Sequence, residues 1–260
     1  MTKHTFAICA YGDSPYLEAC MKSLVSQSVK TNIILCTSTP SQYIEKLAAQ
    51  YKIPVYVRQG ESDIQDDWNF AYDKADSPLV TIAHQDDMYG KDYVKTLLKY
   101  YGKYPDMTLF TTDYVTVKER DLKGKKLVEW VKVILRLPLR NPKWNHFTWV
   151  KKAALMFGNS ICCPACTYQK KILGDHLFQS EFRYTLDWDT LLSLAERKGR
   201  FICVERPLIY YRVHSGATTK KWIQNNKRSE EELAMFAKFW PKPAVQALEY
   251  FYKKAYGAYE

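Results

Sequence analysis

The sequence predicts an α/β fold with a Rossmann-like, mostly parallel central sheet and helices on both faces. Short apolar runs typical of buried strands recur along residues 1–117, and segments with apolar residues at helical spacing lie between them. Such alternation favours parallel strands joined by crossover helices. Residues 221–260 carry further helical patterns. We therefore expect a helical C-terminal extension beside the main domain.

Five apolar runs are expected to form the strands of the first half. Ser14 and Pro15 suit the start of the helix after the first run, and Thr39 with Gln42 resembles a capping box after the second. Helical spacing of apolar residues then marks two further helices, around residues 68–75 and 94–101. The expected strands are residues 6–10, 32–36, 53–57, 79–84 and 109–117.

The chain changes character in residues 118–220. Residues 118–152 are basic and aromatic, and the prolines within 136–142 are expected to break any long helix. A helix over 182–200 is predicted to end at Gly199, with strands over 201–204 and 208–213 after it. The final segment is predicted to hold two helices, of which the first is capped by Ser229 and Glu232 and ends before Pro241.

The bulk composition limits the function classes. The chain has 260 residues, 47% hydrophobic residues and a net charge of +10, which indicates a real core and anionic partners. We see no signal peptide and no membrane-spanning run, so we expect a cytoplasmic protein, with the inner face of the cell membrane as a peripheral contact. The seven cysteines are expected to be core residues, since Cys163-Pro-Ala-Cys166 lacks the second half of a zinc site.

Two adjacent carboxylates, Asp86 and Asp87, end the apolar run 79–84. Ligands bind at the carboxyl ends of the strands in parallel sheets. The segments 10–13 and 37–39 follow two other strands, so three strand ends are expected to converge. Carboxylate oxygens suit Mg2+ and Mn2+, which share ligands with substrate phosphates. The pattern therefore indicates a divalent-cation site, although acidic pairs also occur in ordinary turns.

The order of motifs resembles the family 2 glycosyltransferases of the GT-A fold. The resemblance covers about residues 4–220 and is carried by five segments in the family's order. They are Ala10-Tyr-Gly-Asp-Ser-Pro-Tyr-Leu-Glu-Ala-Cys-Met-Lys-Ser-Leu-Val-Ser-Gln27, Trp68-Asn69 through Ala75, Ala83-His-Gln-Asp-Asp87, Leu186-Asp-Trp-Asp189 and Tyr211-Arg-Val-His-Ser215. The resemblance implies the GT-A fold and an inverting transfer from a nucleotide-sugar donor.

The resemblance also implies roles for the metal and the base. Asp86 or Asp87 would bind Mn2+ or Mg2+, which would stabilise the departing diphosphate, and His214 is the second candidate ligand. Arg212 could instead face the diphosphate as a bidentate donor. Asp187 matches the position of the catalytic base and opens a predicted helix, where capping is the simpler role. Asp189 is the alternative base.

Two positions depart from the family pattern on the nucleotide side. The first Asp of the metal motif is His84 here, and the Asp expected after the second strand is replaced around Thr37 and Ser38, either of which could donate a hydrogen bond to the base. These changes affect the identity of the donor more than the reaction class. The predicted substrate- and nucleotide-binding residues are Ala10, Tyr11, Asp13, Thr37, Arg58, Asn69, His84, Gln85, Asp86 and Arg212.

The resemblance implies transfer of a sugar from a nucleotide sugar, most often a UDP-hexose or UDP-N-acetylhexosamine in this family, to a hydroxyl of a saccharide or glycolipid acceptor, in surface polysaccharide biosynthesis. Residues 1–117 would bind the nucleotide sugar, and residues 118–220 of the same domain would bind the acceptor and carry the base. The basic aromatic segment 130–152 would either contact an anionic membrane that carries a lipid-linked acceptor or place its tryptophans in the core.

Two alternatives remain on the sequence. A nucleotidyltransferase would join a similar sheet to metal-binding carboxylates, but residues 10–15 are acidic and suit a triphosphate poorly. A non-catalytic nucleotide- or nucleic-acid-binding module would use the +10 charge. Its basic residues would form one stripe, whereas Lys and Arg are spread along this chain. We therefore expect no nucleic-acid partner.

Overall fold

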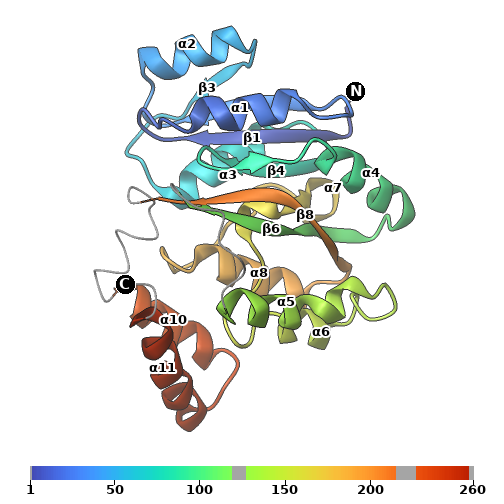
Figure 1. The fold of residues 1–260 in the computed structure, drawn as a ribbon, viewed down its shortest axis with the longest axis vertical. Coiled ribbons are helices and arrows are strands. Elements are labelled where there is room, and N and C mark those ends of the chain that lie inside the picture. The colour runs from blue at the N-terminus through green and yellow to red at the C-terminus, as the bar shows by residue number, and fades with distance from the viewer. Residues whose placement is uncertain (1, 119–126, 215–226, 258–260) are drawn as a thin grey trace.

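A computed structural model describes residues 2–118, 127–214 and 227–257. One eight-stranded sheet with the order β3-β2-β1-β4-β7-β6-β8-β5 forms its centre (Figure 1). The pairs β1–β2, β1–β4, β2–β3 and β6–β8 are parallel, and the pairs made by β7 and β5 are antiparallel. The strands are β1 (His4–Ala10), β2 (Asn32–Thr37), β3 (Val55–Val57), β4 (Leu79–His84), β5 (Met88–Tyr89), β6 (Met107–Lys118), β7 (Thr167–Gln169) and β8 (Arg200–Val213).

Helices cover both faces of this sheet, as the sequence predicts. Alternate residues of β1 point to opposite faces. Phe6 and Ile8 belong to a core cluster that includes residues of α1, α2 and α4, whereas Ala7 belongs to a second cluster that includes residues of α3, α6, α8 and α10. The helices are α1 (Leu17–Val25), α2 (Gln42–Gln50), α3 (Ile64–Lys74), α4 (Tyr93–Lys103), α5 (Leu127–Arg140), α6 (Thr148–Ala153), α7 (Lys170–Leu173), α8 (Leu186–Glu196), α10 (Lys227–Ala237) and α11 (Lys242–Gly257), with a 3-10 turn η1 (Cys163–Ala165).

Several predicted helix starts are displaced by a few residues. The first helix begins at Leu17 and not at Pro15, because Ser14 accepts the Tyr16 N–H in a turn before it. The N-cap of α2 is Ser41, whose hydroxyl accepts the Ile44 N–H, so the prediction of a cap at Thr39 was wrong. The helix predicted to be capped at Ser229 already includes that residue.

The second half differs more from the sequence-based expectation. Helix α5 continues through Pro138 to Arg140, because its buried cations are fixed by tertiary bonds that outweigh the proline. The helix predicted over 182–200 spans only α8. The two strands predicted after it are one strand, β8, whose pairing with β6 has irregular register near Asp113.

Of the two alternatives for the segment 130–152, the structure excludes the one that places its tryptophans in the core. Trp130, Trp144 and Trp149 have 56%, 50% and 65% of their surface accessible. The cysteines behave as expected for core residues, since Cys20, Cys36, Cys163, Cys166 and Cys203 are buried as free thiols, and Cys9 and Cys162 are partly buried. None of the helices in the described residues is long and apolar enough to cross a membrane.

Candidate active site

The carboxyl ends of four parallel strands lie level at one edge of the sheet. In the strand register, Ala10 of β1 pairs with Thr37 of β2, Thr37 pairs with Val57 of β3, and Cys9 pairs with His84 of β4. The segments after these strands are therefore neighbours, as the sequence predicts. Gln85 joins two of them, because its side chain accepts the Tyr11 N–H at 3.1 Å and donates to the Tyr11 carbonyl at 2.9 Å.

Asp86 and His214, which are 128 residues apart in the sequence, lie close together at this edge. The Nε2 atom of His214 lies 3.2 Å from Oδ2 of Asp86, and the other carboxylate oxygen accepts the Ser14 hydroxyl at 2.8 Å. Both side chains are largely but not fully enclosed, with 10% of His214 and 28% of Asp86 accessible. The pairing of β5 with β8 brings His214, which follows β8, back to the metal motif.

This pair of side chains fits a divalent cation. The Nε2 atom of His214 is buried and has no hydrogen-bond partner among the described residues, although a carboxylate oxygen lies 3.2 Å away. An imidazole nitrogen and a carboxylate oxygen are both ligands of Mn2+. Within the described residues, no three His, Cys, Asp or Glu side chains form a metal-binding group. The described residues would thus supply two ligands, with other positions open to a diphosphate or water.

Asp87 differs from its neighbour in both burial and partners. Only 2% of its surface is accessible, and its carboxylate accepts the Arg212 backbone N–H at 2.8 Å. Burial raises the pKa of Asp87 from 3.8 to about 8, an effect that the Arg212 N–H opposes. This carboxylate therefore ties the metal motif to β8, whereas the Asp86 carboxylate is the more accessible of the two.

The raised pKa of Asp87 predicts a pH-dependent stability difference in metal-free buffer. The folded state favours the protonated acid. The contribution of Asp87 to the free energy of unfolding is therefore fully present below about pH 4 and is lost as the pH rises towards about 8. Asp87→Asn retains the acceptor oxygen without the charge, so its stability relative to wild type should rise over this range. Urea unfolding at several pH values with EDTA present would measure it. A constant difference across the series would contradict the assigned burial cost.

The guanidinium of Arg212 is held by other residues of the fold. Its Nε donates to the Asp86 carbonyl at 3.0 Å, and its guanidinium lies over the Tyr16 ring at 4.5 Å. The Tyr16 ring also packs against His214, with ring centroids 4.7 Å apart. Arg212 and Tyr16 therefore fix the positions of the metal-ligand candidates. Tyr16 was not singled out from the sequence, where it looks like an ordinary residue in the first turn of a helix.

Asp187 lies in the first turn of α8, where an anion is favoured. Its carboxylate accepts the Asn159 amide at 2.8 Å, and the side chain is half-buried. Burial raises the pKa of Asp187, and Arg228, the Trp188 N–H, Lys132 and Asn159 oppose that rise. The alternative base, Asp189, is 6% exposed and bonded to Ser180 and Lys238 at 2.7 Å each, which is a structural role.

Two cations near Asp187 were not predicted from the sequence, because α5 and α10 are distant from it along the chain. Lys132 lies one turn before Arg136, whose guanidinium donates to the carbonyl of Ser160, the neighbour of Asn159. Arg228 is ion-paired with Glu232 at 3.0 Å. The next acid of α10, Glu231, accepts the N–H groups of residues 183–185 just before α8.

These neighbours predict how a reaction that uses Asp187 as base would depend on pH. A base acts only when deprotonated, so turnover falls as the pH drops through its pKa. Asn159→Ala or Lys132→Met removes an interaction that favours the carboxylate, so the acid limb should move to higher pH, by about 1 unit or less. Lys171→Met, at an exposed position of α7, is the control. The assignment fails if the acid limbs of both variants coincide with that of wild type.

The remaining nucleotide-side candidates are held by local bonds. The Thr37 hydroxyl is buried and accepts the Thr39 N–H at 3.0 Å, and the Ser38 hydroxyl donates to Asp67 at 2.9 Å, so both expected donors have protein partners. The Asp13 carboxylate accepts the Ser41 hydroxyl at 2.5 Å. Ala10 is 5% exposed, so it contributes backbone only.

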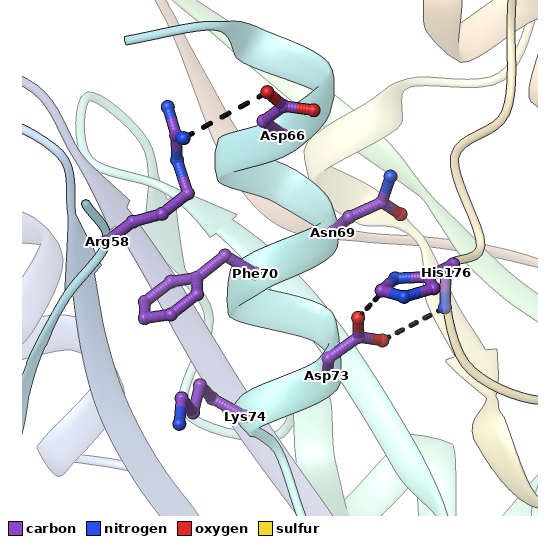
Figure 2. A pocket seen from close by; sticks show the side chains of 7 residues that line it. All are labelled: Arg58, Asp66, Asn69, Phe70, Asp73, Lys74 and His176. Atoms are coloured by element: carbon purple, nitrogen blue, oxygen red, sulfur yellow. Dashed lines mark hydrogen bonds and ion pairs between the residues drawn. The ribbon is translucent and has the colours of Figure 1, made fainter. Parts of the chain in front are cut away.

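Arg58 and Asn69 line a pocket of about 380 Å3 on α3, shown in Figure 2 with Asp66, Phe70, Asp73, Lys74 and His176. Arg58 pairs with Asp67 at 2.6 Å, and Asn69 makes reciprocal bonds with the backbone of Phe178 at 2.7 and 2.9 Å. Asp67 also accepts Ser38 and Ser62, so it organises the ends of β2 and β3. The metal and base candidates lie elsewhere.

His84 is neutral at physiological pH, because burial lowers its pKa to about 4. Its ring packs on Trp68 with centroids 5.1 Å apart, and its Nε2 lies 3.9 Å from Sγ of Cys163. Cys163 is four residues after Asn159, the partner of Asp187. The loop 159–163 therefore connects the end of β4 with the base candidate, which brings two separately predicted motifs to one region.

Comparisons with known proteins agree with this architecture. The family model described as glycosyl transferase family 2 matches residues 5–171. No curated protein sequence matches the chain.

Solved structures resemble the chain in fold at low identity. Staphylococcus aureus TarS 1-349 in complex with UDP has a TM-score of 0.63 at 13% identity, and the alignment covers 95% of this chain and 69% of that one. A Pyrobaculum calidifontis mannosyltransferase in complex with GDP-Man and Mn2+ has a TM-score of 0.59 at 14% identity, and the alignment covers 95% of this chain and 68% of that one. Mycobacterium tuberculosis glucosyl-3-phosphoglycerate synthase, in complex with Mn2+, UDP-glucose and phosphoglyceric acid, has a TM-score of 0.58 at 11% identity. This alignment covers 91% of this chain and 79% of that one. The fold is that of the GT-A glycosyltransferases, and the chain belongs to glycosyl transferase family 2.

Proposed function

We propose that this chain is an inverting, metal-dependent glycosyltransferase that uses a nucleotide diphosphate sugar. The observation that carries the proposal is the approach of His214 Nε2 to Asp86 Oδ2 at 3.2 Å, at the edge where four parallel strands end. A buried imidazole nitrogen without a hydrogen-bond partner, facing a carboxylate, suits a cation. A Mn2+ or Mg2+ ion held there would neutralise the charge that develops on the leaving diphosphate.

Asp187 is the proposed base. An inverting transfer needs a carboxylate that removes the proton of the acceptor hydroxyl as the sugar carbon is attacked. Asn159 orients this carboxylate, and Lys132 and Arg228 favour its ionised form against the cost of burial. Asp189 is engaged with Lys238, which supports the choice between the two acids.

The proposed donor is a UDP-hexose or a UDP-N-acetylhexosamine. The structures of similar fold include complexes with UDP, UDP-GlcNAc and UDP-glucose, and one with GDP-Man, which supports a nucleotide sugar and ranks UDP first. Tyr11 and Gln85 at the strand ends, with Arg58 and Asn69 at the pocket on α3, are the proposed nucleotide-side residues. The buried hydroxyl of Thr37 would shape this region more than it would bind a base.

The proposed acceptor is a hydroxyl of a saccharide or a lipid-linked saccharide in surface polysaccharide assembly. Residues 118–220 would bind it, since they carry the base and the loop that orients it. We further propose a cytoplasmic location with peripheral contact at an anionic membrane. The net charge of +10 supports both the anionic donor and that contact.

Release of nucleotide diphosphate tests this function. Wild-type protein incubated with UDP-glucose, UDP-GlcNAc or GDP-Man and Mn2+ should release the diphosphate from one donor class, even without acceptor, at a low rate set by transfer to water. EDTA should abolish the release. A nucleotidyltransferase would instead release pyrophosphate from a nucleoside triphosphate, so the two activities are distinguished by the product. No release from any donor would contradict the proposal.

A further inference from the structure

The outward face of α5 is apolar, although its inner face carries a cation. Trp130, Ile134 and Leu137 are 56%, 59% and 46% exposed, and they lie on one side of the helix at spacings of four and three. On the other side, Arg136 is 1% exposed and bonded to Asp113 at 2.9 Å. An ordinary surface helix has the opposite arrangement, with its apolar stripe on the core.

The segment after α5 extends the apolar surface. Trp144, Phe147 and Trp149 are 50%, 43% and 65% exposed, and the rings of Phe147 and Trp149 stack with centroids 6.3 Å apart. Helix α6, which contains Trp149, packs against α5, and Figure 1 shows the two helices together on one side of the sheet. With Val131, seven of the sixteen large hydrophobic residues exposed in the described part of the chain fall in residues 130–149. Such a concentration marks an interaction surface.

Resting on the peripheral membrane contact proposed above, we propose that its surface is the outward side of α5 with residues 144–149, which docks in the interfacial layer of an anionic lipid bilayer. Tryptophan favours that layer, where its ring is buried and its N–H stays near polar groups. An amphipathic helix lying in the membrane plane buries its apolar side to about 5–10 Å. These three tryptophans and the aliphatic row of α5 match that mode of binding.

The charge of the chain favours anionic lipid. Residues 127–152 contain six basic residues and one acidic residue, Glu129, and the whole chain carries +10. Lys143 is exposed between α5 and Trp144, where it can meet headgroups. Arg136 and Arg140 are instead bound to Asp113, and Lys132 lies near Asp187. Lys151 is buried against the carbonyls of Arg197 and Gly199, and Lys152 is paired with Glu196. The outward charge of this segment therefore rests on Lys143, with the net charge of the chain behind it. Electrostatic attraction would therefore bring the chain to the bilayer, and apolar burial would keep it there.

Vesicle sedimentation tests the inference with matched variants. The wild-type chain should bind vesicles of phosphatidylcholine with phosphatidylglycerol, and bind phosphatidylcholine alone more weakly. Ile134→Ser/Trp149→Ser should weaken binding to the anionic vesicles by about tenfold or more, since two large apolar groups leave the bilayer. Val25→Ser/Ile172→Ser removes two residues that are each 47% exposed elsewhere, and it should bind as wild type does.

A second measurement does not depend on the variants. Vesicles containing brominated lipid should quench the tryptophan fluorescence of the wild type if Trp130, Trp144 and Trp149 enter the bilayer. Absence of both sedimentation and quenching would overturn the inference, and so would equal weakening by the control pair. The surface would instead bind a second copy of the chain, and the inference would be overturned, if the wild type is a dimer that does not bind vesicles and the Ile134→Ser/Trp149→Ser variant is a monomer. Asp86→Asn should bind vesicles normally, so this result is independent of sugar transfer.

Discussion

Replacing Asp187 with Asn is expected to reduce turnover by about 10²–10⁴-fold, the usual contribution of a general base. The substitution keeps the shape of the side chain and one oxygen that Asn159 can reach, but it removes the ability to accept the acceptor's proton. Because Asp187 lies in the first turn of α8 and not in the metal pair, donor binding should stay within about twofold. Steady-state kinetics with saturating donor, together with calorimetric donor binding, would separate the two effects.

The matched control is Asp189→Asn, two residues further along the same helix. Asp189 is bonded to Ser180 and Lys238, so its loss should lower stability and leave turnover largely intact. Breaking this largely buried pair should cost up to about 3 kcal/mol of unfolding free energy. If Asp187→Asn retains turnover, or if Asp189→Asn alone removes it, the assignment of the base is wrong.

Replacing Asp86 with Asn is expected to abolish the dependence of donor binding on Mn2+. The variant loses one of the two protein ligands proposed for the cation, and the Ser14 hydroxyl can still bond to the remaining oxygen. Loss of about 2 kcal/mol or more, equivalent to at least thirtyfold weaker binding, is expected when a charged ligand is removed from a partly enclosed site. His214→Gln should have a similar effect, since it replaces the other ligand.

Asp76→Asn provides the control for this second prediction, because it removes an exposed carboxylate from the turn before β4. It should bind donor and Mn2+ as wild type does. Comparison with Asp87→Asn adds a further test, since the Asp87 carboxylate is buried and bonded to the Arg212 backbone. If Asp87→Asn loses the metal response and Asp86→Asn keeps it, the roles of the two acids are exchanged.

The first half of the fold could be predicted from the sequence because its strands are continuous apolar runs. Buried parallel strands have no alternation, so runs such as 79–84 indicate them directly, and the order of motifs then fixes the sheet. Strand β7 was missed because its three residues give no periodic signal. Helix α5 was missed because Pro138 argues against it, whereas the bonds of Arg136 to residues far along the chain stabilise it.

The sequence indicated which residues form the candidate site, but it did not indicate which groups each of these side chains contacts. The strand-end motif identified Asp86 and Asp87 together, and only the structure distinguishes the partly accessible carboxylate of Asp86 from the buried one of Asp87, which is bonded to the Arg212 backbone. Lys132 and Arg228 had no local signal, because their approach to Asp187 depends on how α5 and α10 pack. The sequence also left open whether the tryptophans of segment 130–152 lie in the core or at a membrane, and only the tertiary packing shows that they are exposed.

The most direct test of the central claim is a calorimetric titration of wild-type protein with UDP, GDP, dTDP and CMP, each with Mn2+ and with EDTA. A metal-dependent nucleotide-sugar transferase should bind one diphosphate, UDP by our proposal, with an affinity at least tenfold higher when Mn2+ is present. Absence of binding to all four nucleotides in Mn2+, or binding unchanged by EDTA, would contradict a catalytic site formed by Asp86 and His214.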